Sequence, residues 1–236
     1  MEKSRYDQYF MTSEKYIDLI SSYGNLSSKD VVVEVGAGLG HLTRKIAPKA
    51  GKIFAIEKDP ELIPIVEDNL SSCTNVEVIK GDALRMDWPD HNKIISNAPY
   101  SISRDLTVKA LEEGFELAVL TFQKEYVEKL LAPSGSERYR FISALVQSTT
   151  EVEGLDKIPN DAFEPRPPVL SQITRLRDTR PVEKNYVSFV SRLFNQRGKK
   201  IKNILEGIDV PERFKHLRPN KVSPQDILAL FKETRE

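Results

Sequence analysis

VVVEVGAGLG, residues 31–40, is the stretch that decides the fold of this chain. Its first half is an almost unbroken run of valine, which is typical of a parallel strand covered on both faces. Its second half carries Gly36, Gly38 and Gly40, and glycine lets a backbone turn sharply and approach a ligand closely. The stretch therefore predicts a buried strand, a ligand-binding turn and the start of a helix.

The spacing of these glycines separates two classes of cofactor site. The dinucleotide-binding fingerprint is G-x-G-x-x-G. Here the pattern is G-x-G-x-G, and His41 stands where the third glycine of the fingerprint would be. S-adenosylmethionine carries no phosphate, so its site does not need a helix N-terminus aimed at a pyrophosphate. The spacing favours S-adenosylmethionine over a dinucleotide.

Outward from this stretch, predicted strands and helices alternate. The strands are expected at residues 31–35, 52–57, 76–82, 93–97 and 117–123, and the helices at 41–49, 61–70 and 103–113. This alternation predicts an α/β, Rossmann-like fold with right-handed crossovers. Residues 124–147 look helical, and residues 148–177 predict further strands, interrupted by a proline-rich extended loop.

The composition changes after Arg180 and Pro181. Apolar residues recur at helical spacing between 186 and 194, which predicts a helix near 183–196 with one buried face. A second helix is expected near 199–205. Ser223 and Pro224 predict an N-cap and the first position of a last helix, through Phe231. We therefore expect a main domain at residues 1–180 and a small α-helical domain at 181–236.

The composition bounds the class of protein. With 39% hydrophobic and 30% charged residues, the 236-residue chain has the composition of a globular protein. A single cysteine, Cys73, excludes an intramolecular disulfide. The N-terminus lacks an apolar signal region, and no apolar run reaches the roughly 18 residues that span a bilayer. With only three histidines as well, we expect no metal site and a soluble, cytoplasmic protein.

The net charge of zero hides an asymmetry. Residues 165–221 contain 14 Lys and Arg but only 5 Asp and Glu. A basic segment on a neutral protein suggests a polyanionic partner that is met from one side. A solvated face with interspersed charge explains the same count equally well, so the count alone leaves both interpretations open.

Two acidic residues follow the next predicted strands. Glu57 ends the second strand, where a carboxylate can accept both hydroxyls of a ribose, and Asp82 ends the third, where it can accept from an adenine amine. Ligands of open α/β sheets bind at the carboxyl ends of the strands. The predicted cofactor site is formed by Gly36, Gly38, Gly40, Glu57, Asp82, Ala83 and Asn97.

The fourth predicted strand ends in Asn97-Ala98-Pro99-Tyr100, the most specific motif of the chain. An exocyclic adenine amine is a poor nucleophile because its lone pair is delocalised into the ring. The Asn97 side-chain oxygen and the Ala98 carbonyl can accept from its two N–H groups and localise that lone pair. Pro99 fixes the backbone, and Tyr100 offers a face for base stacking, worth roughly 1–3 kcal/mol. The motif predicts methyl transfer to an adenine amine.

Five segments together resemble a known family. They are DQYFM (7–11), NAPY (97–100), FEPRPPVLS (163–171), RGKKI (197–201) and LRP (217–219). The chain resembles the ribosomal RNA adenine N6-dimethyltransferase family (the KsgA family) nearly end to end. Tyr9, Met11 and Ala98 depart from the residues usual in that family. The short interval between Asp82 and Asn97 is closer to archaeal and eukaryotic members.

The resemblance implies a reaction and a set of contacts. Methyl groups from S-adenosylmethionine would be transferred to N6 of two adjacent adenosines, in a hairpin near the 3′ end of small-subunit (16S) ribosomal RNA, during subunit biogenesis. Phe163 would be a second aromatic ring that sandwiches the flipped adenine against Tyr100. The remaining implied site residues are, over the cofactor, Gln8, Tyr9 and Met11, and in the basic RNA-binding tail Arg197, Lys199 and Lys200.

Three alternatives remain open. An adenine-N6 DNA methyltransferase shares the chemistry of the Asn-x-Pro-Tyr motif, but usually has a larger target-recognition region. A large-subunit ribosomal RNA adenine methyltransferase of the antibiotic-resistance type shares nearly every motif. A mainly non-catalytic ribosome assembly factor would use the same fold to bind small-subunit precursors. We expect a monomer that acts on small-subunit ribosomal RNA or on a partly assembled (pre-30S-type) subunit.

Overall fold

The computed structural model describes residues 8–234 and has a seven-stranded sheet at its centre. The strand order is β4-β3-β2-β5-β6-β9-β7. The bounds are β2 Val31–Val35, β3 Lys52–Glu57, β4 Val76–Lys80, β5 Lys93–Ser96, β6 Phe115–Gln123, β7 Glu151–Ile158 and β9 Ser171–Thr179. Strands β4 to β6 are parallel, and β9 pairs antiparallel with both β6 and β7. The prediction of a Rossmann-like α/β fold is confirmed.

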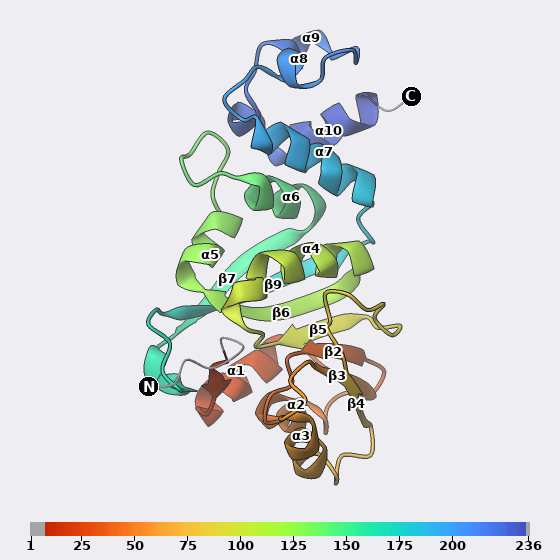
Figure 1. Ribbon diagram of the computed structural model, residues 1–236, viewed down its shortest axis with the longest axis vertical. Helices are drawn as coiled ribbons and strands as arrows, with labels where there is room; N and C mark the ends of the chain where they lie inside the picture. Colours follow the sequence, from red (N-terminus) through yellow and green to blue (C-terminus); the bar gives the residue numbers. More distant parts are fainter. Residues whose placement is uncertain (1–7, 235–236) are drawn as a thin grey trace.

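Helices cover both faces of this sheet (Figure 1). They are α1 Glu14–Tyr23, α2 His41–Ile46, α3 Ile63–Asn69, α4 Ser103–Glu113, α5 Lys124–Leu130 and α6 Phe141–Thr149. Successive residues of a strand point to opposite faces, and β2 shows the result. Val32 packs with residues of α1 and α2, whereas Val33 packs with residues of α4 and α6. The valine run is therefore buried on both faces, as the sequence predicts.

A second, two-stranded sheet joins the N-terminus to the proline-rich loop. Strand β1 (Phe10–Met11) pairs antiparallel with β8 (Phe163–Glu164), which follows the short 3-10 helix η2 (Asn160–Ala162). Thr12 N donates a further hydrogen bond to Ala162 O, 3.0 Å away. These bonds hold the N-terminal strap, residues 8–12, against the main sheet.

The C-terminal segment is helical, as predicted. It contains α7 Lys184–Asn195, α8 Ile201–Ile204, α9 Glu212–Lys215, the 3-10 helix η3 Pro219–Lys221 and α10 Pro224–Glu233. Ser223 accepts from Asp226 N and caps α10, which confirms the predicted N-cap. Helix α8 is shorter than the expected 199–205, because the chain leaves α7 through a turn that includes Gly198. Helix α9 has no counterpart in the sequence prediction.

The tail and the main sheet share one hydrophobic cluster. Val190 of α7 and Leu230 of α10 belong to the same buried cluster as Leu145 of α6 and Leu120 of β6. The division at residue 180 stays a proposal, since the chain passes from β9 to α7 there while the core continues across it. Within residues 8–234, no helix is both long and apolar enough to cross a membrane.

Candidate active site

A cavity of about 260 Å³ opens at the carboxyl ends of β2, β3 and β5. Ligands of open α/β sheets bind at this edge. Among the predicted cofactor and catalytic residues, those that line the cavity are Gln8, Tyr9, Met11, Gly36, Gly38, Glu57, Asp82, Ala83, Asn97, Ala98, Pro99 and Tyr100. The sequence therefore places nearly all of its predicted site residues around one cavity.

The conformation of the glycine-rich turn favours glycine. Gly36 and Gly38 have φ angles of +76° and +58°, a region that other residues enter at a cost of about 1–2 kcal/mol. A Cβ on Gly38 would also lie 3.2 Å from the ring of Phe10. The prediction that Gly40 belongs to the cofactor site is not supported, because Gly40 does not line the cavity. Its φ of +79° serves the start of α2, and a Cβ there would lie 3.2 Å from Leu70.

Glu57 is held at the end of β3 by main-chain donors. Its carboxylate accepts from the N–H groups of Gly38 at 2.8 Å, Lys58 at 2.9 Å and Asp59 at 2.8 Å. A carboxylate offers about four acceptor positions, so roughly one remains for a ligand hydroxyl. The side chain is 5% exposed, so the contacts fix both the turn and the orientation of the carboxylate.

Asp82 lies two residues beyond the end of β4 rather than at the strand end. The strand stops at Lys80, and the Asp82 carboxylate accepts from Leu84 N at 3.1 Å and pairs with Lys58 Nζ at 2.9 Å. The hydrogen bond from Lys58, against the opposing effect of burial and together with the Leu84 bond, lowers the pKa of Asp82. The carboxylate is thus an ionised acceptor at the cavity wall, with Lys58 as its present partner.

Glu34 and Lys58 also line the cavity, although neither is among the predicted site residues. Glu34 is 1% exposed in β2, and burial, partly opposed by the Thr43 hydroxyl, raises its pKa to about 8. Glu34 Oε2 and Thr43 Oγ1 are both buried, and neither has a hydrogen-bond partner within residues 8–234. A glutamate inside a valine run is a signal of a buried acid. Lys58 gives no comparable signal in the sequence.

Asn97 follows β5 directly, and its side chain is partly satisfied. Ser96 Oγ donates to Val35 O at 2.6 Å, which joins the end of β5 to the end of β2. Asn97 Nδ2 donates to Tyr9 O at 3.4 Å. Asn97 Oδ1 is buried and has no hydrogen-bond partner among residues 8–234. A buried acceptor without a partner costs about 1–3 kcal/mol, so this oxygen is available to a donor that enters the cavity.

Tyr100 opens the 3-10 helix η1 (Tyr100–Ile102). Its hydroxyl shares a short hydrogen bond with the hydroxyl of Ser171 at the start of β9. The ring of Tyr9 stacks on the ring of Tyr100, with centroids 5.4 Å apart and planes inclined by 25°. Tyr100 is 8% exposed, so its ring is already enclosed by protein.

The N-terminal strap crosses the cavity and is fastened on both sides. Gln8 Nε2 donates to Asp59 Oδ2 at 2.9 Å, and Met11 O lies 3.0 Å from Nδ1 of His41. Met11 is 5% exposed. Gln8, Tyr9 and Met11 line the cavity, and the cofactor contacts that the resemblance implies for them stay a prediction. Asp7, the first residue of the motif, lies outside the described residues.

The structure does not bring Phe163 to Tyr100, which corrects the predicted sandwich. Phe163 is 1% exposed and lies opposite Met11 in the β1–β8 pair, where it packs with Ile17 and Ile158 in the core. It does not line the cavity. The burial has a physical reason, since β8 points this side chain into the core once its backbone pairs with β1.

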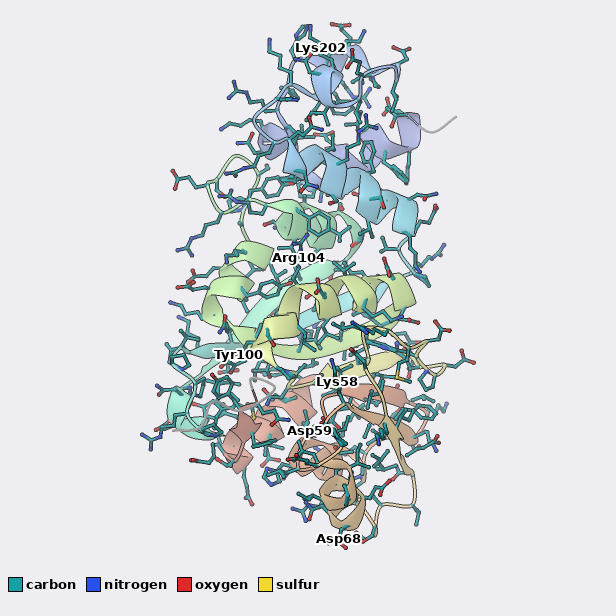
Figure 2. The ribbon with its side chains drawn as sticks, in the orientation of Figure 1. Lys58, Asp59, Asp68, Tyr100, Arg104 and Lys202 are labelled. Carbon is teal, nitrogen blue, oxygen red and sulfur yellow. The ribbon has the colours of Figure 1, made fainter. Side chains whose placement is uncertain are left out.

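The basic residues of the tail lie far from the cavity. Arg197, Lys199 and Lys200 are exposed in the turn between α7 and α8. Figure 2 shows the neighbouring Lys202 at one end of the molecule, and Tyr100 and Lys58 in the other half. The three basic residues of the tail can therefore contact a substrate in the cavity only if that substrate extends well beyond it. Within residues 8–234, no group of three or more His, Cys, Asp or Glu side chains could hold a metal ion.

Comparisons with known proteins agree with this arrangement. The sequence profile of the ribosomal RNA adenine dimethylase family matches residues 1–233. A "probable ribosomal RNA small subunit methyltransferase A" of Methanosarcina mazei is 34% identical, over 95% of this chain and 90% of the relative. A dimethyladenosine transferase from Plasmodium falciparum has a similar fold, with a TM-score of 0.82 at 24% identity over 95% and 96% of the two chains. The 23S rRNA methyltransferase ErmE has a TM-score of 0.73 at 26% identity over 96% and 100%.

Proposed function

The chain belongs to the ribosomal RNA adenine dimethylase family, and from this premise we propose that its substrate is the small-subunit ribosomal RNA. It is an S-adenosylmethionine-dependent adenine dimethyltransferase. The proposed targets are N6 of two adjacent adenosines in a hairpin near the 3′ end of that RNA, methylated during subunit biogenesis. The name of the Methanosarcina mazei relative supports the small subunit.

The observation that carries the proposed chemistry is the unpartnered Oδ1 of Asn97 at the cavity wall. An adenine N6 amine has two N–H groups and few other ways to be satisfied in a buried site. In the proposed complex, one N–H donates to Asn97 Oδ1 and the other to the carbonyl of Ala98. These two bonds hold the nitrogen in place and localise its lone pair, which is electrostatic preorganisation of the kind that lowers reaction barriers.

The cavity fits S-adenosylmethionine by the chemistry of its wall. The acceptor capacity left on Glu57 suits a ribose hydroxyl, Asp82 suits an adenine amine, and the turn at Gly36 lets the cofactor lie against the backbone. S-adenosylmethionine supplies a methyl group that is already activated as a sulfonium. The protein therefore aligns and encloses the reactants and needs no side-chain nucleophile.

The RNA must present its base outside the helical stack. A flipped base costs a few kcal/mol, and least in a loop. Arg197, Lys199 and Lys200 are proposed to hold flanking phosphates, with a steep salt dependence as the consequence. One copy of the chain supplies every residue proposed for the site, so we propose that it acts as a cytoplasmic monomer on small-subunit RNA or on a pre-30S-type subunit.

The test uses labelled S-adenosylmethionine with three substrates: purified 30S-type subunits lacking the modification, naked large-subunit RNA, and duplex DNA. Label in two adjacent adenosines of the small-subunit RNA supports the proposal. Label mainly in large-subunit RNA would support the antibiotic-resistance type, which the similarity to ErmE keeps as the second candidate. Label in DNA, or in none of the three, would contradict both.

Asn97→Ala tests the chemistry separately from the choice of substrate. Loss of one preorganised hydrogen-bonding group costs about 10²–10³ in kcat, so transfer should fall at least about 100-fold. The urea-unfolding midpoint should stay close to the wild-type value, which shows that the variant is folded. Asn185→Ala removes the same side chain from an exposed position of α7 outside the cavity and should retain transfer.

A further inference from the structure

The ring of Tyr9 covers one face of the Tyr100 ring. Tyr100 is only 8% exposed, and the ring of Tyr9 stacks against it at a centroid distance of 5.4 Å. Both rings line the cavity that contains Asn97. A base cannot stack on this face of Tyr100 while the Tyr9 ring stays in place.

The two rings also leave no slot between them. A stacked base occupies about 3.4 Å of height, so a base held between two parallel rings needs about 7 Å between their planes. The Tyr9 and Tyr100 planes are inclined by only 25° with centroids 5.4 Å apart, which is a direct stacking contact. The base must therefore replace the Tyr9 ring rather than slide in beside it.

The backbone of Tyr9 is fixed by contacts that do not involve its ring. Tyr9 O accepts from Asn97 Nδ2, and its neighbours are held by the Gln8–Asp59 bond and the contact of Met11 O with His41. Rotation about the side-chain bonds of Tyr9 would move the ring and leave these contacts intact. The orientation of the Asn97 amide is therefore preserved when the ring leaves Tyr100.

We propose that Tyr9 is a positioning residue of the base site, whose ring takes the place of the target adenine on Tyr100 until the RNA displaces it. This proposal rests on the proposed function, because it needs an adenine that stacks on Tyr100. It assigns the Tyr9 ring to the RNA substrate, and leaves only its main chain in the wall around the cofactor. The stack keeps the face of Tyr100 dry before the RNA arrives.

The first test separates affinity for RNA from the rate of transfer. An aromatic pair of this kind is worth a factor of about 2 to 10, and the base must compete with it. Tyr9→Ala should therefore lower the KM for 30S-type subunits about 2- to 10-fold at saturating S-adenosylmethionine, with kcat little changed. Tyr9→Phe keeps the stack and should behave like the wild type.

Three results would overturn the proposal. A higher KM in Tyr9→Ala would make the ring a permanent wall of the base site. An unchanged KM would make the stack irrelevant to the substrate. A calorimetric loss of S-adenosylmethionine affinity of more than about 10-fold would make the ring a part of the cofactor site. If the wild type methylates no RNA at all, the proposed function fails first, and this proposal fails with it.

A second test follows the ring itself and needs no turnover. Tyr9→Trp places a fluorescent ring on Tyr100, against the constant background of the buried Trp88. Addition of 30S-type subunits should shift the emission of Tyr9→Trp to the red, as the ring turns toward solvent, and leave the emission of the parent protein unchanged. Subunit binding, measured by sedimentation, without a red shift would contradict the displacement.

Discussion

Glu34→Gln is expected to stabilise the protein relative to the wild type, by an amount that grows as the pH rises. Glu34 is 1% exposed in the middle of β2, and burial raises its pKa to about 8. At neutral pH the folded protein therefore holds this carboxyl mostly as the neutral acid. The unfolded chain exposes it to water, where it ionises near its ordinary value of about 4.3.

Proton linkage determines how the free energy of unfolding changes with pH. Between the unfolded and folded pKa values, the folded state holds one proton more than the unfolded state, so the wild-type free energy of unfolding falls as the pH rises. The slope is about 1.4 kcal/mol per pH unit. The contribution is complete below about pH 4 and is lost by the time the pH passes the folded value of about 8. Glutamine has the same shape and does not titrate.

The assay is urea unfolding of both proteins at pH 5, 6, 7, 8 and 9 without ligand. The difference in the free energy of unfolding should rise by about 1.4 kcal/mol per pH unit between pH 5 and 7, flatten near pH 8 and then level off. Glu67→Gln, on the exposed face of α3, serves as the matched control and should give a difference that does not change with pH. Parallel curves for Glu34→Gln and the wild type would refute the assignment of a raised pKa to this buried group.

Three further outcomes are expected. Gly38→Ala should destabilise the protein by about 1–2 kcal/mol in urea unfolding, because its φ of +58° is strained for alanine, and should weaken calorimetric binding of S-adenosylmethionine. Lys93→Ala should cost about 1–3 kcal/mol, because it removes the buried ammonium that lies 3.1 Å from Asp30 and donates to Gly24 O, while Ser27 and Asn92 still donate to Asp30; a loss below about 0.5 kcal/mol would contradict this. Replacing Lys199 and Lys200 together by alanine should weaken RNA binding and reduce the slope of log K against log salt by about 1.5, whereas an unchanged slope would remove both from the phosphate contacts.

Local patterns predicted the parallel half of the fold well. Strand β3 and helix α4 have the bounds that the sequence indicates, and β5 ends one residue earlier than expected. The reason is that a buried strand or an amphipathic helix reports its own periodicity within a short window. Residues 124–147, expected to be helical, are two helices, because Pro133 and Gly135 lie in the turn between α5 and α6.

Pairings between distant segments could not be predicted in this way. The pairing of β9 with β6, and that of β1 with β8, join residues at least 48 positions apart. The β1–β8 pairing determines where Phe163 lies. The family resemblance implies a place beside Tyr100, whereas the structure buries Phe163 in the core. The stack of Tyr9 on Tyr100 likewise joins two segments that are distant in the sequence.

The chemistry of the cavity was easier to predict than its electrostatics. The end of β3 and the end of β5 bring Glu57 and Asn97 to one cavity, as their places after predicted strands imply. The raised pKa of Glu34 and the ion pair between Lys58 and Asp82 depend on three-dimensional burial and distance. Sequence position alone gives neither quantity.

The shared hydrophobic cluster of α6, α7, α10 and the central sheet has a mechanical consequence. This contact is rigid, because separating the C-terminal helices from the central sheet would expose its apolar side chains to water. The distance between the cavity and the basic turn at residues 197–200 is therefore fixed. An RNA that binds both regions, as we propose, must place its reactive base and its phosphates at that separation.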